Sequence, residues 1–332
     1  MAKSNFRMLL YKVLLQTKGR QTSSNLGFTL IELLVSIVIA GIVVSGLLFV
    51  VVELLRVDQR EVALDQVQSD MQRAIDYIAD DLKEAIYVYS TPATVTSQLV
   101  NLDNDITTNN GVPVLAFWRT DPIEAAEIAS LPSGSEPDGC PTGDTACSAI
   151  KARRASYTLV AYYQTEEYGA WEGNPLKRYE LAQYDDLAAG YDLTPGFTAP
   201  FNAAGSANDF AGWTASGTGD DGTRNVLVDY VSAIKNTTND APNPVVDCQA
   251  FTDDSAHVLS PADATENTGF FACVRPTTVT GTGGFRTNQD VFLFLRGDAT
   301  PASSFLQPAS AGSRLPILQT QIKLGGVIDR DE

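Results

Sequence analysis

The stretch Gly27-Phe28-Thr29-Leu30-Ile31-Glu32 opens an apolar run that lasts to Val52 and decides how the chain is organised. From Phe28 to Val52 the run contains one ionisable side chain, Glu32, and no proline. A helix rises about 1.5 Å per residue, so residues 33–52 alone cover the roughly 30 Å core of a bilayer. A carboxylate beside such a membrane helix is costly, which marks Glu32 as a functional candidate.

The charges on the two sides of this run differ in sign. Five basic residues and no acid precede Phe28: Lys3, Arg7, Lys12, Lys18 and Arg20. Removing these five from the 23 basic residues leaves 18 against 40 acidic residues, a net charge of −22. A basic flank predicts that the leader stays in the cytoplasm and that the remainder faces outward. The acidic exterior argues against nucleic acid as a partner, because phosphate binding depends on Lys and Arg.

The leader does not follow the order of a secretory signal peptide, in which cleavage comes after the apolar core. Here the Gly27–Phe28 junction precedes the apolar run, so cleavage at that point keeps the apolar helix on the mature protein.

The helical pattern continues beyond Val52. Apolar residues recur at spacings of three and four, which is typical of one face of an amphipathic helix: Leu64, Val67, Met71, Ile75, Ile78, Leu82, Ile86 and Tyr89. No proline occurs before Pro92, and the sequence predicts one helix over residues 28–90. The expected organisation is a leader at 1–27, a transmembrane or filament-core helix at 28–52, its amphipathic continuation at 53–90 and a β-rich head at 91–332.

The head sequence consists of short segments of β-prone residues separated by Gly, Pro, Asn, Asp and Ser. Strands are expected at 112–118, 156–164, 177–184, 270–274, 290–296 and 317–324, with 156–164 and 177–184 forming a hairpin. Residues 225–235 fit a strand or a short helix equally well. Two segments, 130–147 and 189–224, read as long loops. The predicted fold class is α+β, with a long N-terminal helix packed on a β-rich head.

Four cysteines, Cys140, Cys147, Cys248 and Cys273, lie in the part predicted to be exported. An even number in an oxidising compartment predicts two disulfides, and three pairings are possible. Proximity in the sequence favours Cys140 with Cys147 and Cys248 with Cys273.

With these residues in view, Gly27-Phe28-Thr29-Leu30-Ile31-Glu32 followed by LLVSIVIAGIVVSG resembles the prepilin-type signal of type IV pilins and type II secretion pseudopilins. The resemblance implies that a membrane prepilin peptidase cleaves between Gly27 and Phe28 and that Phe28 is then N-methylated. It also implies that Glu32 pairs with the N-terminal amine of a neighbouring subunit and sets the register of assembly. The expected partners are other pilins or pseudopilins, the peptidase, the inner-membrane assembly platform and the membrane itself.

The remainder of the chain is similar to larger minor pilins and pseudopilins of the J- or W-like type. Residues 65–89 in particular are similar to pseudopilins of cyanobacterial hormogonium polysaccharide secretion. The resemblance implies a non-enzymatic filament subunit, anchored in the plasma membrane by a single span with its head in the periplasm and later displayed on the pilus or pseudopilus.

Two other classes of function remain open at this point. The long loops and a tyrosine-rich set around residues 157–184 fit an adhesin or substrate-binding head, although core packing explains these aromatic residues as well. An exported enzyme with an uncleaved anchor is the third possibility, but the chain has a single histidine, His257, and no catalytic motif. No cofactor or metal is expected. The acidic pairs at 103–105 and 220–221 lack the spacing of a calcium loop, and His257 is expected at the surface.

Overall fold

The computed structural model describes residues 28–166, 171, 173–185, 187, 191–200, 210–217, 219–233, 245–252, 256–265, 268–276, 289–299 and 315–324. The chain divides into two compact units, Met1–Val57 and Asp58–Glu332, and each is described by itself.

The described part of the first unit is the beginning of a long helix, α2 (Leu30–Lys83). Thr29 stands just before it, and the Glu32 N–H donates to the Thr29 hydroxyl at 3.3 Å and to its carbonyl at 3.0 Å. All side chains from Phe28 to Leu55 are exposed. By length and composition, α2 is the one helix among the described residues that is able to cross a membrane.

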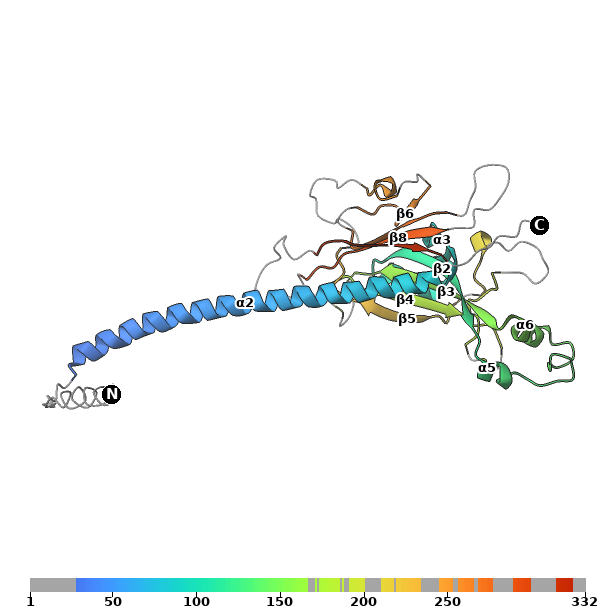
Figure 1. Cartoon of the computed structure of the whole chain (residues 1–332), viewed down its shortest axis with the longest axis horizontal. Coiled ribbons are helices and arrows are strands. Elements are labelled where there is room, and N and C mark those ends of the chain that lie inside the picture. Colours follow the sequence, from blue (N-terminus) through green and yellow to red (C-terminus); the bar gives the residue numbers. More distant parts are fainter. Residues whose placement is uncertain are drawn as a thin grey trace, which may run out of the picture. The chain divides into compact units, whose positions relative to one another are not determined.

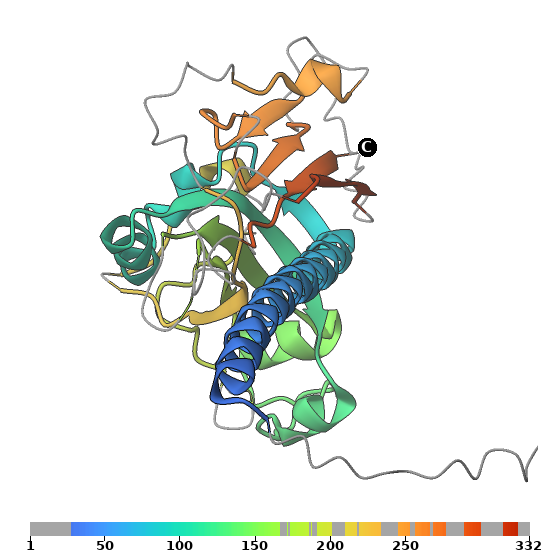
Figure 2. The same ribbon diagram turned by 90° about the vertical axis from the view of Figure 1, so that its left-hand side faces the viewer.

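In the second unit, α2 buries one stripe of its surface. Five of the buried apolar residues belong to the predicted amphipathic face, namely Val67, Met71, Ile75, Ile78 and Leu82, and Ala74 and Ala79 are buried beside them. They belong to a single core cluster with residues of both β-sheets. Figures 1 and 2 show this half of α2 running alongside both sheets.

The helix ends seven residues earlier than predicted, at Lys83 rather than Ser90. Residues Ala85–Val88 form strand β1 instead, because Ile86, Tyr87 and Val88 favour an extended backbone and find a partner strand. The prediction was wrong here since the spacing of apolar residues continues unchanged across the boundary.

The first sheet has five antiparallel strands in the order β1, β2 (Val112–Pro122), β3 (Ala155–Gln164), β4 (Leu176–Ala182) and β5 (Thr223–Val228). The predicted hairpin of β3 and β4 is confirmed. Pro113 lies at the start of β2, and the pairing of β2 with β3 shifts between Pro113 and Leu115. The sequence left β5 undecided between strand and helix, and it is a strand over the first part of the segment.

The second sheet has four antiparallel strands, β6 (Val258–Ser260), β7 (Phe270–Val274), β8 (Asp290–Leu295) and β9 (Leu318–Lys323). It lies above the first sheet in Figure 2, in orange and red. A long helix packed on antiparallel sheets gives the α+β architecture that the sequence predicts.

Short helices were missing from the predicted head. They are α3 (Ala93–Thr96), α4 (Val100–Thr108), α5 (Ala125–Ser130), α6 (Thr145–Arg153) and the 3₁₀ turns η1 (Phe210–Gly212) and η2 (Cys248–Ala250). Val95, Leu99, Leu102 and Ile106 pack on the face of the first sheet opposite α2, together with Phe197, Phe210 and Trp213 from the predicted long loop. The first sheet is therefore covered on both faces.

Two disulfides join Cys140 to Cys147 and Cys248 to Cys273, the pairing that proximity in the sequence favours. The first lies in a small separate core with Ile123, Leu131 and Ile150. The Cys248–Cys273 disulfide packs on the outer face of the second sheet.

Candidate functional site

The first candidate site is the N-terminal end of α2. Phe28 is 76% exposed and Glu32 is exposed in the first helical turn. Gly27, the expected cleavage residue, lies outside the described residues. Cleavage and methylation at this end remain predictions.

Thr29 is a functional candidate that the sequence analysis missed. Its hydroxyl accepts the N–H of Glu32 at the position expected of a helix N-cap. The signal was present, because Thr-x-x-Glu is the sequence pattern of a capping box. Thr29 therefore fixes where the helix begins and keeps Glu32 within the first turn.

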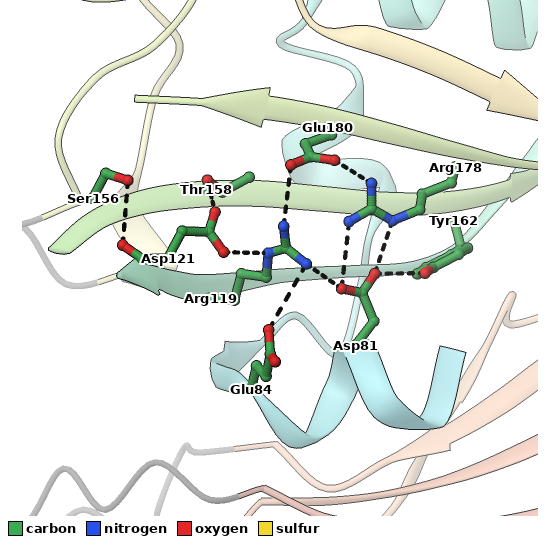
Figure 3. Close-up of polar contacts among 9 residues, drawn as sticks. All are labelled: Asp81, Glu84, Arg119, Asp121, Ser156, Thr158, Tyr162, Arg178 and Glu180. Carbon is green, nitrogen blue, oxygen red and sulfur yellow. Dashed lines mark hydrogen bonds and ion pairs between the residues drawn. The ribbon is translucent and has the colours of Figure 1, made fainter. Parts of the chain in front are cut away.

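The second site is a buried ion network that ties the end of α2 to the first sheet (Figure 3). Asp81 of α2 is 6% exposed. Its carboxylate accepts hydrogen bonds from Arg119 of β2 at 2.5 Å, from Arg178 of β4 at 2.8 Å and from the Tyr162 hydroxyl of β3 at 2.6 Å. One helical carboxylate thus contacts three neighbouring strands of the sheet.

The two arginines extend this network along the sheet. Arg119 reaches Glu180 at 3.1 Å and Glu84 at 3.9 Å, and its Nε forms an ion pair with Asp121 at 2.9 Å without hydrogen-bond alignment. Arg178 also pairs with Glu180. The Asp121 carboxylate accepts a hydrogen bond from the Thr158 hydroxyl at 2.5 Å.

The electrostatics of the network favour an ionised Asp81. Burial on its own raises the pKa of this carboxyl, but the hydrogen bonds from Arg178 and Tyr162 and the charges of both arginines outweigh that effect. The pKa of Asp81 therefore lies below its ordinary value of 3.8. Burial next to the same carboxylate raises the pKa of Tyr162, so its phenol stays protonated and donates. The arrangement holds the end of α2 on the first sheet through a buried carboxylate.

Two further carboxylates hold tyrosines on the opposite face of the first sheet. Tyr163 donates to Asp105 at 2.6 Å, and Asp105 also pairs with Lys177 at 3.1 Å. Tyr179 donates to Asp220 at 2.6 Å. Burial raises the pKa of both phenols. These acids, which the sequence weighed as calcium ligands, thus serve internal contacts.

The same contacts explain most of the tyrosine-rich set. Tyr162, Tyr163 and Tyr179 are fully buried, so core packing accounts for them and they offer no surface to a glycan. Trp171, in contrast, is 44% exposed. Tyr168 lies outside the described residues.

His257 is not at the surface, so that expectation was wrong. Its side chain is 1% exposed, lies 3.3 Å from Asp290 and packs against the Phe292 ring. The reason is that His257 directly precedes β6 and its side chain contacts Asp290 and Phe292 of β8, which the polar sequence around it did not indicate. Among the described residues, no group of three or more His, Cys, Asp or Glu side chains is arranged to hold a metal ion.

Comparison with known proteins gives one family match. Residues 22–48 match the prokaryotic N-terminal methylation motif. No curated protein and no solved structure matches the chain. The matched motif includes Gly27, Phe28 and Glu32 and leads into α2, and this combination of motif and long apolar helix fits a type IV pilin or pseudopilin with a pilin-like α+β architecture.

Proposed function

We propose that this chain is a minor pilin or pseudopilin, a non-enzymatic subunit of a type IV pilus or type II secretion-like filament. The observation that carries the proposal is the methylation motif at residues 22–48 leading into a helix whose apolar side chains are exposed up to Leu55 and buried in the head from Val67 onward. An exposed apolar half fits a membrane or a bundle of like helices, and a buried half fits a folded head.

Processing is the first step of the proposed function. Prepilin peptidase removes residues 1–27 and leaves Phe28 as the N-methylated terminus. Before assembly, the apolar helix remains in the membrane and the head lies on the periplasmic side. Intact mass and N-terminal peptide mass spectrometry test this step. A mature chain that begins at methylated Phe28 is expected, whereas a chain that begins at Met1 in cells with active peptidase overturns the proposal.

Assembly is the second step, and we assign it to Glu32. Inside a packed helix bundle an unpaired carboxylate is costly while a paired one specifies register, so Glu32 selects one axial position next to the amine of a neighbour. E32Q and E32A are expected to leave the chain in the membrane and out of sheared filaments, with processing intact. E53A is the matched control, because Glu53 is an exposed acid of the same helix that forms only a surface ion pair with Arg56. Equal incorporation of E32Q and E53A would rule out the register role.

The third part of the proposed function is the secretion system that the filament serves. The similarity of residues 65–89 to pseudopilins of hormogonium polysaccharide secretion supports a role in polysaccharide export or motility. Deletion of the gene is expected to abolish export of the polysaccharide, and restoration should require Glu32. Normal export in the deletion strain points to a different pilus or secretion system.

A further inference from the structure

We infer that Asp81 is a positioning residue that fixes the register of α2 on the head, and with it the length of helix between the head and Glu32. Register here means which residues of α2 face which residues of the two sheets. The consequence for Glu32 rests on the proposed function, whereas the register of α2 does not. Asp81 contacts three strands of the first sheet through Arg119, Tyr162 and Arg178 (Figure 3).

The buried apolar face of α2 repeats every four residues. Each of its members up to Ile78 is followed four residues later by another buried apolar residue: Val67 by Met71, Met71 by Ile75, Ala74 by Ile78, Ile75 by Ala79 and Ile78 by Leu82. A slip of four residues, about 6 Å along the helix axis, therefore places apolar side chains against the same apolar surface. Differences in side-chain volume disfavour such a slip, but cores tolerate repacking when the apolar pattern is kept. The apolar face alone thus permits more than one register.

A close contact between α2 and the turn after β8 does not distinguish these registers either. A Cβ at Gly297 in this turn would come within 2.7 Å of the Val67 side chain and 2.9 Å of the Met71 side chain. Val67 and Met71 are themselves four residues apart, so a slip of that length exchanges one apolar side chain for another at the same place. Gly297 allows α2 to pack closely on the turn without selecting its position along the helix axis.

Asp81 is the polar member of the buried face of α2. It is 6% exposed, and its carboxylate accepts hydrogen bonds from Arg119 at 2.5 Å and from Arg178 at 2.8 Å. The residues four positions before and after it are Tyr77 and Ala85, and neither supplies a carboxylate. A slip would therefore separate a buried carboxylate from both arginines, which is costly. A buried polar residue with fixed partners selects one register in this way, as it does in coiled coils.

The register of α2 has a direct consequence for assembly. α2 is one continuous helix that carries both Glu32 and Asp81. A slip of four residues would lengthen or shorten the helix between Glu32 and the head by about 6 Å. In the proposed filament Glu32 sets the axial position of the subunit, so a slipped head would meet its neighbours out of place. Asp81 thus positions the head for assembly without contacting the neighbouring subunit.

The test replaces the buried ionic contact with apolar side chains instead of removing one partner. D81L/Y162F/R178M deletes the carboxylate together with two of the groups that donate to it, and Arg119 keeps ion pairs with two other carboxylates. Apolar replacement of a whole buried ionic contact is often neutral or stabilising. We therefore expect this variant to fold, with a urea midpoint close to that of wild type.

The distance between two spin labels reports the register. S69C/D185C places the labels at exposed positions on α2 and just beyond β4, and the four native cysteines are paired in disulfides. Twelve residues separate Ser69 from Asp81, about 18 Å along the helix axis. Asp185 follows the part of β4 that contacts Asp81. The distance between the labels therefore changes when α2 slides along the sheet.

The distances are measured on the full chain in detergent micelles. Wild type is expected to give one distance, and so is the matched control D80L/K83M, which replaces the exposed ion pair of the same helical turn. The apolar triple variant is expected to give a second or displaced peak, shifted by up to about 6 Å, at an unchanged urea midpoint. A single unshifted peak overturns the inference. A broad distribution with a lowered midpoint also overturns it, because the contact would then contribute stability alone.

Filament incorporation of the same variants without labels tests the consequence for assembly. The apolar triple variant is expected to be processed at Phe28 and to stay in the membrane but to be lost from sheared filaments, while the control is incorporated like wild type. Normal incorporation of a variant whose label distance is displaced overturns the positioning role. N-terminal mass spectrometry separates this result from a failure of the proposed function, because an unprocessed wild-type chain disproves that function while the label distances do not depend on it.

Discussion

At the scale of single residues, Asp81 connects the helix to the sheet through contacts that no exposed acid of α2 makes. D81A removes the carboxylate that pairs with the half-buried Arg119 and the buried Arg178, and we expect a loss of about 3 kcal/mol in the free energy of unfolding. Urea unfolding of the full chain in detergent, followed by tryptophan fluorescence, measures this because Trp118 is fully buried.

The adjacent residue provides the control for that measurement. Asp80 is exposed and pairs only with Lys83, at 2.8 Å, so D80A should cost less than about 1 kcal/mol. Equal losses in D80A and D81A would mean that the buried network contributes no more than a surface ion pair.

At the scale of elements, one side chain joins the two sheets at the edge strand β1. The Val88 N–H donates to Gln289 Oε1 at 2.9 Å, and Gln289 Nε2 donates back to the Val88 carbonyl at 2.8 Å. Q289A leaves both backbone groups buried without a partner and should cost about 2–4 kcal/mol. Q319A, at an exposed position of β9, is the control and should stay within about 0.5 kcal/mol of wild type. The same urea titration checks both, and a Q289A curve that overlays wild type refutes the role.

Removal of the two disulfides should destabilise regions of different size. They close loops with sequence separations of 7 and 25 residues. By lowering the entropy of the unfolded chain, loops of these lengths stabilise the folded state by about 2.5 and 3.5 kcal/mol. C248A/C273A should lower the unfolding midpoint of the head, because Cys273 is a buried residue of β7. C140A/C147A should instead raise amide exchange in residues 123–154 and leave the sheets protected, because those cysteines have a separate core. Hydrogen exchange with mass detection separates the cases, and uniform deprotection by C140A/C147A contradicts this view.

How far the sequence predicts these elements depends on where their partners lie. The buried half of α2 and the strands β3, β7 and β8 follow from local periodicity, which each segment carries on its own. The end of α2 does not, because β1 exists only through its pairing with β2, in which Val88 faces Phe117, 29 residues further along the chain. The short helices α3 and α4 are likewise fixed by packing on the sheet rather than by length or propensity.

The two candidate sites differ in the same way. Glu32 could be proposed from the sequence because the expected cleavage residue, the acid and the apolar run are contiguous, and its role stays a prediction. The Asp81 network could not, because Arg119 and Arg178 become neighbours only when β2, β3 and β4 assemble in register. The helix cap formed by Thr29 is intermediate in how well the sequence predicts it. Its Thr-x-x-Glu pattern is local, but it is recognisable only once the start of the helix is known.

At the scale of the whole molecule, stability should depend on pH through the carboxylates whose pKa is lowered in the folded chain. The folded chain holds the pKa of Asp81 below 3.8, so between the folded and unfolded values the unfolded state binds more protons. The stabilisation from Asp81 is therefore complete above about pH 4 and is lost as the pH falls through the folded value. Asp138 and Asp144 also have lowered pKa values, through hydrogen bonds to Ser148 and to the Cys147 N–H, so the total acid response contains more than one group.

Substitution by asparagine separates the share of Asp81 from the rest. D81N should be less stable than wild type at pH 7, and the difference between the two urea midpoints should shrink as the pH falls below about 4, because wild type then loses the charge that D81N never had. Midpoints at pH 7, 5, 4 and 3 measure this, with D80N as the exposed control whose small difference should persist. A D81N gap that stays constant down to pH 3 would show that the network does not depend on the charge of Asp81, and the link between α2 and the first sheet would then rest on apolar packing alone.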